Sequence, residues 1–326
     1  MPRIKLLVIS HPDPDIMREL QKLQDSCEVF VSDNEPELRN WIPAAEVVLY
    51  RGVSGKSLTS SDLWQQTRAV RWVHSLSAGV EHLLSSGLIS SDVQLTNARG
   101  VFKRSLAEFA VLGVLFHYKR VRRLIDNQRQ HEWERISVKF ADERVMGIVG
   151  YGEIGRECAL LAKGLGLKIH GLRRNPQRST QDPILDRVFG PQELNEMLRN
   201  IDILLCAAPL TRQTHHMISS AQFAVMKTTA IVINVGRGAV IDQAALISAL
   251  QIERIAGASL DVFEEEPLPP GSPLWAMENV LISPHSTDET EDPSPLDLGM
   301  RLFVENLRRY REGQPLLNVV DKHAGY

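Results

Sequence analysis

The stretch Val145-Met146-Gly147-Ile148-Val149-Gly150-Tyr151-Gly152-Glu153-Ile154-Gly155 carries the strongest fold signal in this chain. A mostly apolar segment of strand length runs into three glycines spaced Gly-x-Gly-x-x-Gly, and a helical pattern from Ile154 to Leu165 follows at once. In such a turn the first glycine permits a sharp exit from the strand, the second lets the backbone approach a pyrophosphate, and the third lets the helix pack closely. Because the free N–H groups of a helix N-terminus also suit phosphate, the pattern predicts a dinucleotide site formed by Gly150, Gly152, Glu153, Ile154 and Gly155.

Strand-like segments continue on the far side of this turn and alternate with helical patterns. Together with Val145–Val149 before the turn, they make six: Val145–Val149, Leu167–Leu172, Ile203–Cys206, Ala230–Asn234, Ile255–Leu260 and Val280–Ile282. Alternation of this kind favours α/β architecture with a parallel sheet. The sequence therefore predicts a Rossmann-type, doubly wound parallel sheet.

The first hundred residues alternate in the same way and predict a second domain. Its expected strands are Ile4–Ile9, Val29–Val31, Val47–Tyr50, Arg71–Val73 and Val93–Leu95. We expect residues 1–100 to form a flavodoxin-like substrate domain, completed by a C-terminal helix within about 296–326, and residues 101–295 to form the dinucleotide-binding domain. A single long helix is expected from Ser105 to about Ile125, followed by a polar connection over 127–142 and, near the C-terminus, a helix over Leu298–Tyr310.

Composition excludes several classes of partner. The chain has 326 residues and a net charge of −3, so we expect neither a nucleic-acid nor a membrane partner. Its three cysteines match no metal-ligand spacing, and we expect no metal site. The apolar run Leu6-Leu7-Val8-Ile9 is too short for a signal peptide core or a membrane span. These features predict a cytoplasmic protein.

The end of the strand Leu167–Leu172 bears on which cofactor is used. An acidic residue about twenty positions beyond the first glycine ordinarily binds the ribose hydroxyls of NAD. Here the strand ends in Gly171-Leu172-Arg173-Arg174, without an acid. Two adjacent guanidinium groups suit a 2′-phosphate, so Arg173 and Arg174 predict NADP in preference to NAD. The alternative is a solvated arginine pair on a loop.

Three further motifs each follow a predicted strand of the second domain. They are Asn234-Val235-Gly236-Arg237-Gly238, Leu260-Asp261-Val262-Phe263-Glu264-Glu265-Glu266-Pro267 and Ser283-Pro284-His285. Together with Thr96-Asn97-Ala98-Arg99-Gly100-Val101, Ala107-Glu108-Phe109 and Pro209-Leu210-Thr211, they resemble the D-isomer-specific 2-hydroxyacid dehydrogenases over nearly the whole chain. The resemblance implies two α/β domains with the active site in the cleft between them, and usually a homodimer.

The resemblance also implies roles for individual residues. Arg237 would bind the substrate, His285 would be the acid/base and Glu266 its partner, while Asp261 would touch the nicotinamide end of the cofactor. The backbone N–H groups of Ser77-Ala78-Gly79 would hold the substrate carboxylate. Arg51 is a candidate second substrate contact, although an ordinary loop arginine is an equal alternative. We expect the remaining cofactor contacts from the loops after the strands: Ala208, Pro209, Val235, Gly236, Arg237 and His285.

The chemistry of 2-keto acid reduction asks for the same residue types. A guanidinium such as that of Arg237 offers a permanent, forked positive charge for carboxylate and carbonyl oxygens. A histidine titrates near neutral pH, so His285 can give a proton in reduction and take one in oxidation. A carboxylate such as Glu266 would raise the pKa of the imidazole and orient its ring.

We therefore expect an enzyme that reduces a small 2-keto acid, such as glyoxylate or hydroxypyruvate, to the D-2-hydroxy acid. An alternative of another class is an NAD(H)-sensing binding protein or corepressor with little turnover, and a third is a different Rossmann oxidoreductase. One segment departs from the family pattern: after His285 the chain reads Ser286-Thr287-Asp288-Glu289, where the family usually has a small, glycine-containing stretch. Asp288 and Glu289 add negative charge near the expected anion site, which leaves three alternatives: a narrower choice of substrate, a slower turnover or a solvated segment.

Overall fold

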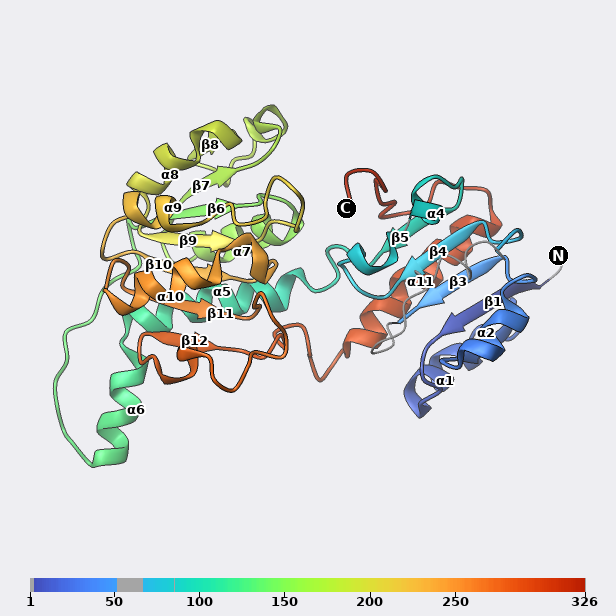
Figure 1. Ribbon diagram of the computed structural model, residues 1–326, viewed down its shortest axis with the longest axis horizontal. Helices are drawn as coiled ribbons and strands as arrows, with labels where there is room; N and C mark the ends of the chain where they lie inside the picture. Colours follow the sequence, from blue (N-terminus) through green and yellow to red (C-terminus); the bar gives the residue numbers. More distant parts are fainter. Residues whose placement is uncertain (1–2, 52–66, 85, 326) are drawn as a thin grey trace. The chain divides into compact units, whose positions relative to one another are not determined.

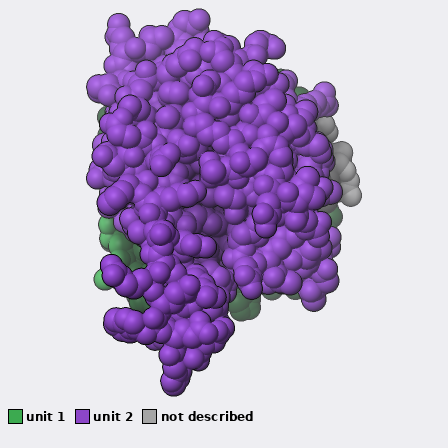
Figure 2. All heavy atoms as spheres, turned by 90° about the vertical axis from the view of Figure 1, so that its left-hand side faces the viewer, with its two compact units in different colours: residues 1–102, 290–326 green, residues 103–289 purple. Residues whose placement is uncertain are grey.

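The computed structural model describes residues 3–51, 67–84 and 86–325. These residues form two compact units, shown separately coloured in Figure 2. Unit 1 contains the chain up to Phe102 and from Thr290 onward, and unit 2 contains Lys103–Glu289. Among the described residues, no helix is both long and apolar enough to cross a membrane.

Unit 2 is built on a seven-stranded parallel sheet with the order β12-β11-β10-β9-β6-β7-β8 (Figure 1). The strands are β6 (Val145–Val149), β7 (Lys168–Leu172), β8 (Arg187–Phe189), β9 (Ile203–Cys206), β10 (Ile231–Asn234), β11 (Gly257–Leu260) and β12 (Val280–Ile282). The prediction of a doubly wound Rossmann-type sheet is confirmed. The chain runs outward from β6 through β7 to β8, then returns to the other side of β6 as β9, so the topological switch lies where the glycine turn follows β6.

Strand β8 was not anticipated from the sequence. It has only three residues, and their burial increases from exposed Arg187 to buried Phe189. A run this short carries too little periodicity to be separated from a loop. It pairs with β7 through His170, Gly171 and Leu172 and forms one edge of the sheet.

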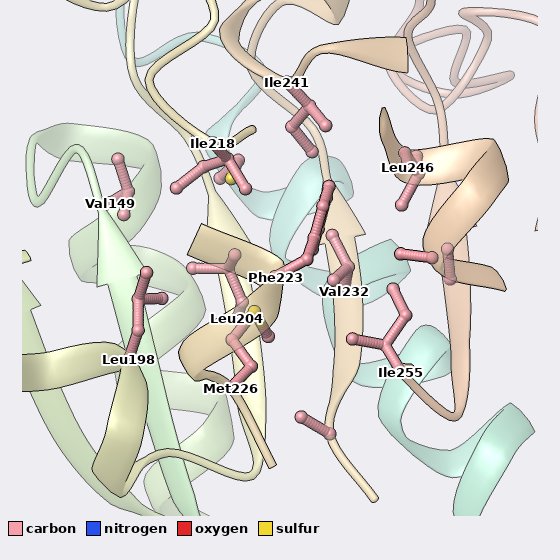
Figure 3. Packing of buried hydrophobic residues seen from close by; sticks show 14 of the residues in the cluster. Val149, Leu198, Leu204, Ile218, Phe223, Met226, Val232, Ile241, Leu246 and Ile255 are labelled. Atoms are coloured by element: carbon pink, nitrogen blue, oxygen red, sulfur yellow. The ribbon is translucent and has the colours of Figure 1, made fainter. Parts of the chain in front are cut away.

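One hydrophobic cluster of unit 2 lies between the sheet and the helices α8 (Leu194–Asn200), α9 (Ser220–Val225) and α10 (Gln243–Gln251). Figure 3 shows Leu204 of β9 and Val232 of β10 facing Phe223 of α9. All residues of β9 and β10 are buried, which fits their nearly continuous apolar sequences, since strands of a sheet covered on both faces are buried on both sides.

The expected single helix over Ser105–Ile125 is wrong, because two helices occupy this region. Helix α5 (Lys103–Tyr118) is followed by a turn at Lys119 and Arg120, where Arg120 adopts a left-handed φ of 54°, and α6 (Val121–Gln130) comes next. The carbonyl of Tyr118 accepts from the amide of Lys139, on the segment that returns from α6. This long-range bond takes the acceptor that the next helical turn would need. Helix α6 also extends into the stretch over 127–142 that was expected to be a connection.

Unit 1 contains a five-stranded parallel sheet with the order β2-β1-β3-β4-β5, which is the flavodoxin-like order. The strands are β1 (Ile4–Ile9), β2 (Cys27–Ser32), β3 (Val47–Tyr50), β4 (Trp72–Ser75) and β5 (Gln94–Asn97). The helices of unit 1 include α1 (Pro14–Gln21), α2 (Glu35–Trp41), α4 (Ser86–Ile89) and the C-terminal α11 (Pro295–Arg311).

The C-terminal helix belongs to unit 1 because its apolar face covers the sheet there. Phe303 is fully buried and stacks on Trp72 of β4, with ring centroids 5.3 Å apart. Tyr310 stacks on the same indole and donates a hydrogen bond to Glu46 over 2.8 Å. The helix starts at Pro295, three residues before the predicted start, because Ser294 and Asp297 form a capping box at its N-terminus.

Candidate active site

The glycine turn after β6 has the geometry that its spacing predicts. Gly150 has a φ of +92°, and a Cβ atom there would lie 2.5 Å from the backbone of Ala208. A Cβ atom on Gly155 would lie 2.6 Å from the carbonyl oxygen of Gly150. These two glycines are therefore required by the fold itself, the first for the turn and the second for close packing of α7 (Glu153–Lys163).

Gly152 differs, because the protein around it leaves space. A Cβ atom there would have no described heavy atom within 4 Å, and the backbone φ of −105° is open to any residue. The fold therefore does not need a glycine at this position. A ligand that approaches the backbone from outside would need one, because a side chain would occupy its space. Gly152 is also the N-cap of α7, and the first-turn amides of a helix lack intrahelical acceptors. Both features fit the pyrophosphate of a dinucleotide.

The loops after β9 and β10 pack against this turn through Ala208. A Cβ atom on Gly236 would lie 2.8 Å from the carbonyl oxygen of Ala208, so the segments that contain Gly150, Ala208 and Gly236 are in close contact. The carbonyl of Pro209 accepts from Thr214 over 2.6 Å, which fixes the course of the loop after β9. Val235 is buried directly after β10. The structure thus brings the expected cofactor contacts Ala208, Pro209, Val235 and Gly236 to the carboxyl edge of the sheet, beside the glycine turn.

Arg173 and Arg174 leave the end of β7 at the same edge. The Arg173 guanidinium donates to the hydroxyl of Ser179, a buried residue at the end of the next turn. The Arg173 amide also bonds to the carbonyl of Phe189 over 3.1 Å. Arg173 is therefore half-buried and held at a defined place, whereas Arg174 is exposed. Ser179 is a residue that the sequence interpretation missed.

The loop that carries Arg237 is held by the last residue of β10, Asn234. The Asn234 side chain accepts from the amide of Gly236 at 3.1 Å and donates to the carbonyl of Arg237 at 3.1 Å. The Arg237 guanidinium donates to the Gly236 carbonyl at 2.8 Å. Gly238 follows with its α-carbon packed on the chain at Phe263, where a Cβ atom would overlap the backbone at 1.9 Å. This close contact ties the arginine loop to the loop that carries Glu266.

His285 and Glu266 form a direct pair. The Nδ1 atom of His285 lies 2.7 Å from Oε2 of Glu266, and the other carboxylate oxygen accepts from the amide of Phe263 at 2.8 Å. The side chains are 43% and 34% exposed, so the pair is fixed yet open to solvent. With Nδ1 bonded to the carboxylate, the second ring nitrogen, Nε2, is the one that can exchange a proton with a substrate.

Electrostatics at this pair favour the protonated histidine. The hydrogen bond to Glu266 raises the pKa of His285 above its ordinary value, outweighing the opposing effect of burial. Burial by itself raises the pKa of Glu266, but the bonds from His285 and the Phe263 amide outweigh it and lower that pKa. Arg237 is close enough to act on both groups. The three residues expected to carry the chemistry are therefore neighbours in unit 2.

Asp261 is buried, and its carboxylate accepts hydrogen bonds from neighbouring residues of the chain. It accepts from the hydroxyls of Ser283 and Thr287, both at 2.6 Å, and from the amides of Ser286 at 3.1 Å and Thr287 at 3.3 Å. The segment that departs from the family pattern is therefore bound to Asp261. Asp288, next along the chain, is half-buried, and burial raises its pKa.

The expected substrate loop lies in unit 1, directly after β4. The amide of Ser77 bonds to the hydroxyl of Ser75 at 3.2 Å, and the carbonyl of Ala78 accepts from the side chain of Asn97 at 2.6 Å. Residues 77–79 are partly exposed. Asn97 is a second residue whose role the sequence did not reveal, because its partner lies on a different loop.

Arg51 also lies in unit 1, after β3, and forms an ion pair with Asp13. Asp13 is the N-cap of α1, where its carboxylate accepts from the amides of Asp15 and Ile16. The candidate second substrate contact is thus an arginine already attached to a helix cap.

Comparisons with known proteins agree with this arrangement. Residues 111–287 match the family model described as D-isomer specific 2-hydroxyacid dehydrogenase, NAD binding domain. A glyoxylate reductase of Aeropyrum pernix is 30% identical over 99% of this chain and 98% of its own length. A glyoxylate/hydroxypyruvate reductase B of Yersinia enterocolitica is 32% identical over 82% of each chain.

Solved structures are similar over the whole chain. A D-isomer specific 2-hydroxyacid dehydrogenase from Xanthobacter autotrophicus, in complex with NADPH and MES, has a TM-score of 0.84 and 30% identity, covering 100% of both chains. An NADPH-dependent glyoxylate/hydroxypyruvate reductase from Sinorhizobium meliloti, in complex with NADP and sulfate, has a TM-score of 0.85 and 26% identity, covering 99% of this chain and 100% of that one. This chain therefore belongs to the D-isomer specific 2-hydroxyacid dehydrogenase family and is an NAD(P)-dependent enzyme of that family.

Proposed function

We propose that this protein reduces a small 2-keto acid, such as glyoxylate or hydroxypyruvate, to the D-2-hydroxy acid with NADPH. The observation that carries the proposal is the His285–Glu266 pair at 2.7 Å beside Arg237, on the strand-end loops of a dinucleotide-binding sheet. Relatives named for glyoxylate and hydroxypyruvate reduction support the choice of substrate.

In this proposal Arg237 holds the oxygens of the substrate. Its guanidinium is always charged and presents paired N–H donors, so it can bind a carboxylate and stabilise the negative charge that develops on the carbonyl oxygen during reduction. The bond from Asn234 to the Arg237 carbonyl fixes the loop from which the side chain projects. This restraint reduces the entropy lost when substrate binds.

His285 supplies the proton. As imidazolium, it donates from Nε2 to the carbonyl oxygen as the carbon accepts a hydride, and in the reverse reaction it takes the proton back from the hydroxyl. Glu266 stabilises the imidazolium and keeps the ring oriented through Nδ1. The bound nicotinamide cofactor supplies the hydride. Reduction should therefore slow as the pH rises through the pKa of His285.

We propose NADP as the preferred cofactor. Arg173, anchored by Ser179, and the exposed Arg174 offer charge-assisted donors for a 2′-phosphate at the end of β7. Relatives solved with NADPH or NADP bound support the same choice. The roles of Asp261 toward the nicotinamide end, and of the Ser77–Gly79 loop and Arg51 toward the substrate, remain our predictions.

We also propose that the protein works as a homodimer, in the cytoplasm. Figure 1 shows α6 and the segment after it projecting from the body of unit 2. Trp133 is 99% exposed and Phe140 78% exposed on this arm, a large apolar surface for a monomer to leave in water. A second copy that pairs with the arm would cover both rings. Changing both to serine should yield a monomer by sedimentation, whereas changing Trp275, 52% exposed elsewhere in unit 2, should leave the dimer intact.

The activity is tested by following NADPH and NADH oxidation with a panel of 2-keto acids. We expect turnover with glyoxylate or hydroxypyruvate and a preference for NADPH. His285→Ala should lose on the order of 10²–10⁴-fold in kcat, the usual contribution of an acid/base residue. Wild-type protein that binds NADPH but reduces no member of the panel would refute the proposal.

A further inference from the structure

We propose that Thr287 is a positioning residue for His285, held in place by Asp261 and Ser105. The inference rests on the proposed function, in which His285 is the acid/base. Thr287 lies two residues beyond His285, in the segment where this chain departs from the family pattern. The hydroxyl and amide groups of this segment fix the backbone from which the imidazole projects.

Three parts of Thr287 are bound at once. Its hydroxyl donates to Oδ2 of Asp261 at 2.6 Å, and its amide donates to Oδ1 of the same carboxylate at 3.3 Å. Its carbonyl accepts from the hydroxyl of Ser105, near the start of α5. The hydroxyl bond fixes the side chain, and the bonds to the amide and the carbonyl fix the backbone on both sides of it. Thr287 therefore connects the loop that follows β12 to helix α5 and to the loop that follows β11.

The carboxylate of Asp261 lies at the centre of this network. Ser283, two residues before His285, donates its hydroxyl to Oδ1, and Ser286, directly after His285, donates its amide to the same oxygen. Asp261 is only 1% exposed, and a buried carboxylate requires such bonds. The chain on both sides of His285 is thus attached to one fixed group, which is itself anchored by the bond from the Asp261 amide to Asn234.

His285 needs this restraint because its own backbone is unusual. Its φ is +51°, in the left-handed region that a residue with a side chain rarely adopts. Its amide bonds to the carbonyl of Asp261 at 2.9 Å. Such a conformation persists only where the surroundings enforce it. We infer that the Thr287 bonds enforce it and so keep Nδ1 within 2.7 Å of Glu266.

Within the described part of the chain, the charged groups that act on the imidazole include these four: Glu266, Asp261, Asp288 and Arg237. Of these four, Glu266 is the one that bonds to the ring, so its effect on the pKa depends most strongly on a fixed distance. Loosening the loop should therefore weaken the Glu266 contact and let the pKa of His285 fall toward its ordinary value. This makes the ring pKa a measure of positioning that needs no turnover.

The experiment compares Thr287→Val, which keeps the shape but removes the hydroxyl, with Thr287→Ser, which keeps the hydroxyl. Thr229→Val is the matched control, since Thr229 is exposed at the opposite end of the strands, before β10. The ring protons of His285 are titrated by NMR, with His285→Gln to assign its signal among the ten histidines. Steady-state kcat and KM are then measured with glyoxylate and NADPH.

For Thr287→Val we expect the His285 pKa to fall by about half a unit or more, and kcat to fall by about tenfold with little change in the KM for NADPH. Thr287→Ser and Thr229→Val should resemble wild type. Folded Thr287→Val with an unchanged ring pKa and kcat, or a Thr287→Ser variant as impaired as Thr287→Val, would overturn the proposal. Absence of wild-type turnover with every 2-keto acid of the panel would refute the proposed function instead, and the NMR titration would still test the positioning role.

Discussion

Two asparagines end strands in the two units and hold functional loops in similar ways. Asn234 ends β10 in unit 2, accepts from the amide two residues on and donates to the Arg237 carbonyl. Asn97 ends β5 in unit 1, accepts from the Arg99 amide at 3.3 Å and donates to the Ala78 carbonyl. Each side chain closes an Asx-type turn and also restrains a second backbone group.

The two asparagines differ in how far apart in the chain their partners lie. Both partners of Asn234 lie within three residues, so the motif that contains Arg237 stabilises itself. Asn97 instead holds a loop nineteen residues away, and its own carbonyl accepts from Asn318, which lies 221 residues further along the chain. The loop of unit 2 is therefore determined by local sequence, whereas the loop of unit 1 depends on the C-terminal segment returning to the sheet.

The largest effect expected among these tests is a loss of kcat when the negative charge of Glu266, in unit 2, is removed. Glu266→Gln keeps an acceptor for His285 but removes the negative charge that raises its pKa. Because reduction needs the imidazolium, its rate falls as pH rises through the His285 pKa, and in the variant that decline should begin at a lower pH. Around pH 8 we expect a loss on the order of 10²-fold in kcat, measured across a pH series, and a smaller loss near pH 6.

A second glutamate–histidine pair provides the control for this variant. Glu264 lies 2.5 Å from Nε2 of His216, also in unit 2. Glu264→Gln should leave the pH profile of reduction unchanged. An identical profile for Glu266→Gln and wild type would show that Glu266 does not tune the acid/base group.

The same difference between contacts that are close in the sequence and contacts that are distant in it explains what could be predicted from the sequence. The glycine turn, Arg237 and the paired arginines could be proposed from the sequence because each belongs to a short pattern that contains the residue types its expected chemistry needs. The break between α5 and α6 was missed because it depends on the bond from Lys139 to Tyr118. The roles of Asn97, Ser179 and Thr287 were missed because hydroxyl and amide side chains are common on loops, and only their contacts distinguish them.

Arg173 offers a test of whether the expected 2′-phosphate contact in unit 2 depends on residues that are close together in the sequence. Arg173 is fixed by Ser179, six residues on. Arg173→Ser should raise the KM for NADPH by about 10- to 100-fold, since a hydrogen bond to a charged group contributes about 1.5–3 kcal/mol. The KM for NADH should change little. Arg199→Ser, on the exposed face of α8, is the control, and an equal rise in both cofactors' KM would argue against a 2′-phosphate site.

Substitutions of the two asparagines should have different, smaller effects on substrate and cofactor binding. Asn97→Ala releases the carbonyl of Ala78, and we expect a rise of roughly tenfold in the KM for the keto acid, the equivalent of about 1.4 kcal/mol of binding. The Kd for NADPH, measured by fluorescence titration, should not change. Asn234→Ala should weaken both, because Gly236 is an expected cofactor contact and Arg237 is an expected contact of both cofactor and substrate. If Asn97→Ala weakened NADPH binding as much as substrate binding, the distinction between the two loops would be lost.

The smallest expected effect lies in unit 1, at Asp13. Its carboxylate caps α1 and pairs with Arg51, and the bond from the Ile16 amide contributes most to lowering its pKa below the ordinary 3.8. Asp13→Ala should reduce the free energy of unfolding by about 1 kcal/mol at pH 7. A carboxylate with a lowered pKa stabilises the fold above its ordinary pKa and stops doing so as the pH falls through the folded-state value. The deficit of the variant in chemical denaturation should therefore shrink below about pH 4.

Asp13→Asn distinguishes the cap from the ion pair, because asparagine caps a helix about as well as aspartate but carries no charge. We expect it to recover most of the stability that Asp13→Ala loses. Its KM for the keto acid then reports on Arg51. A lower KM would mean that Asp13 competes with the substrate carboxylate for that guanidinium, whereas an unchanged KM in both variants would restrict Arg51 to anchoring the first turn of α1.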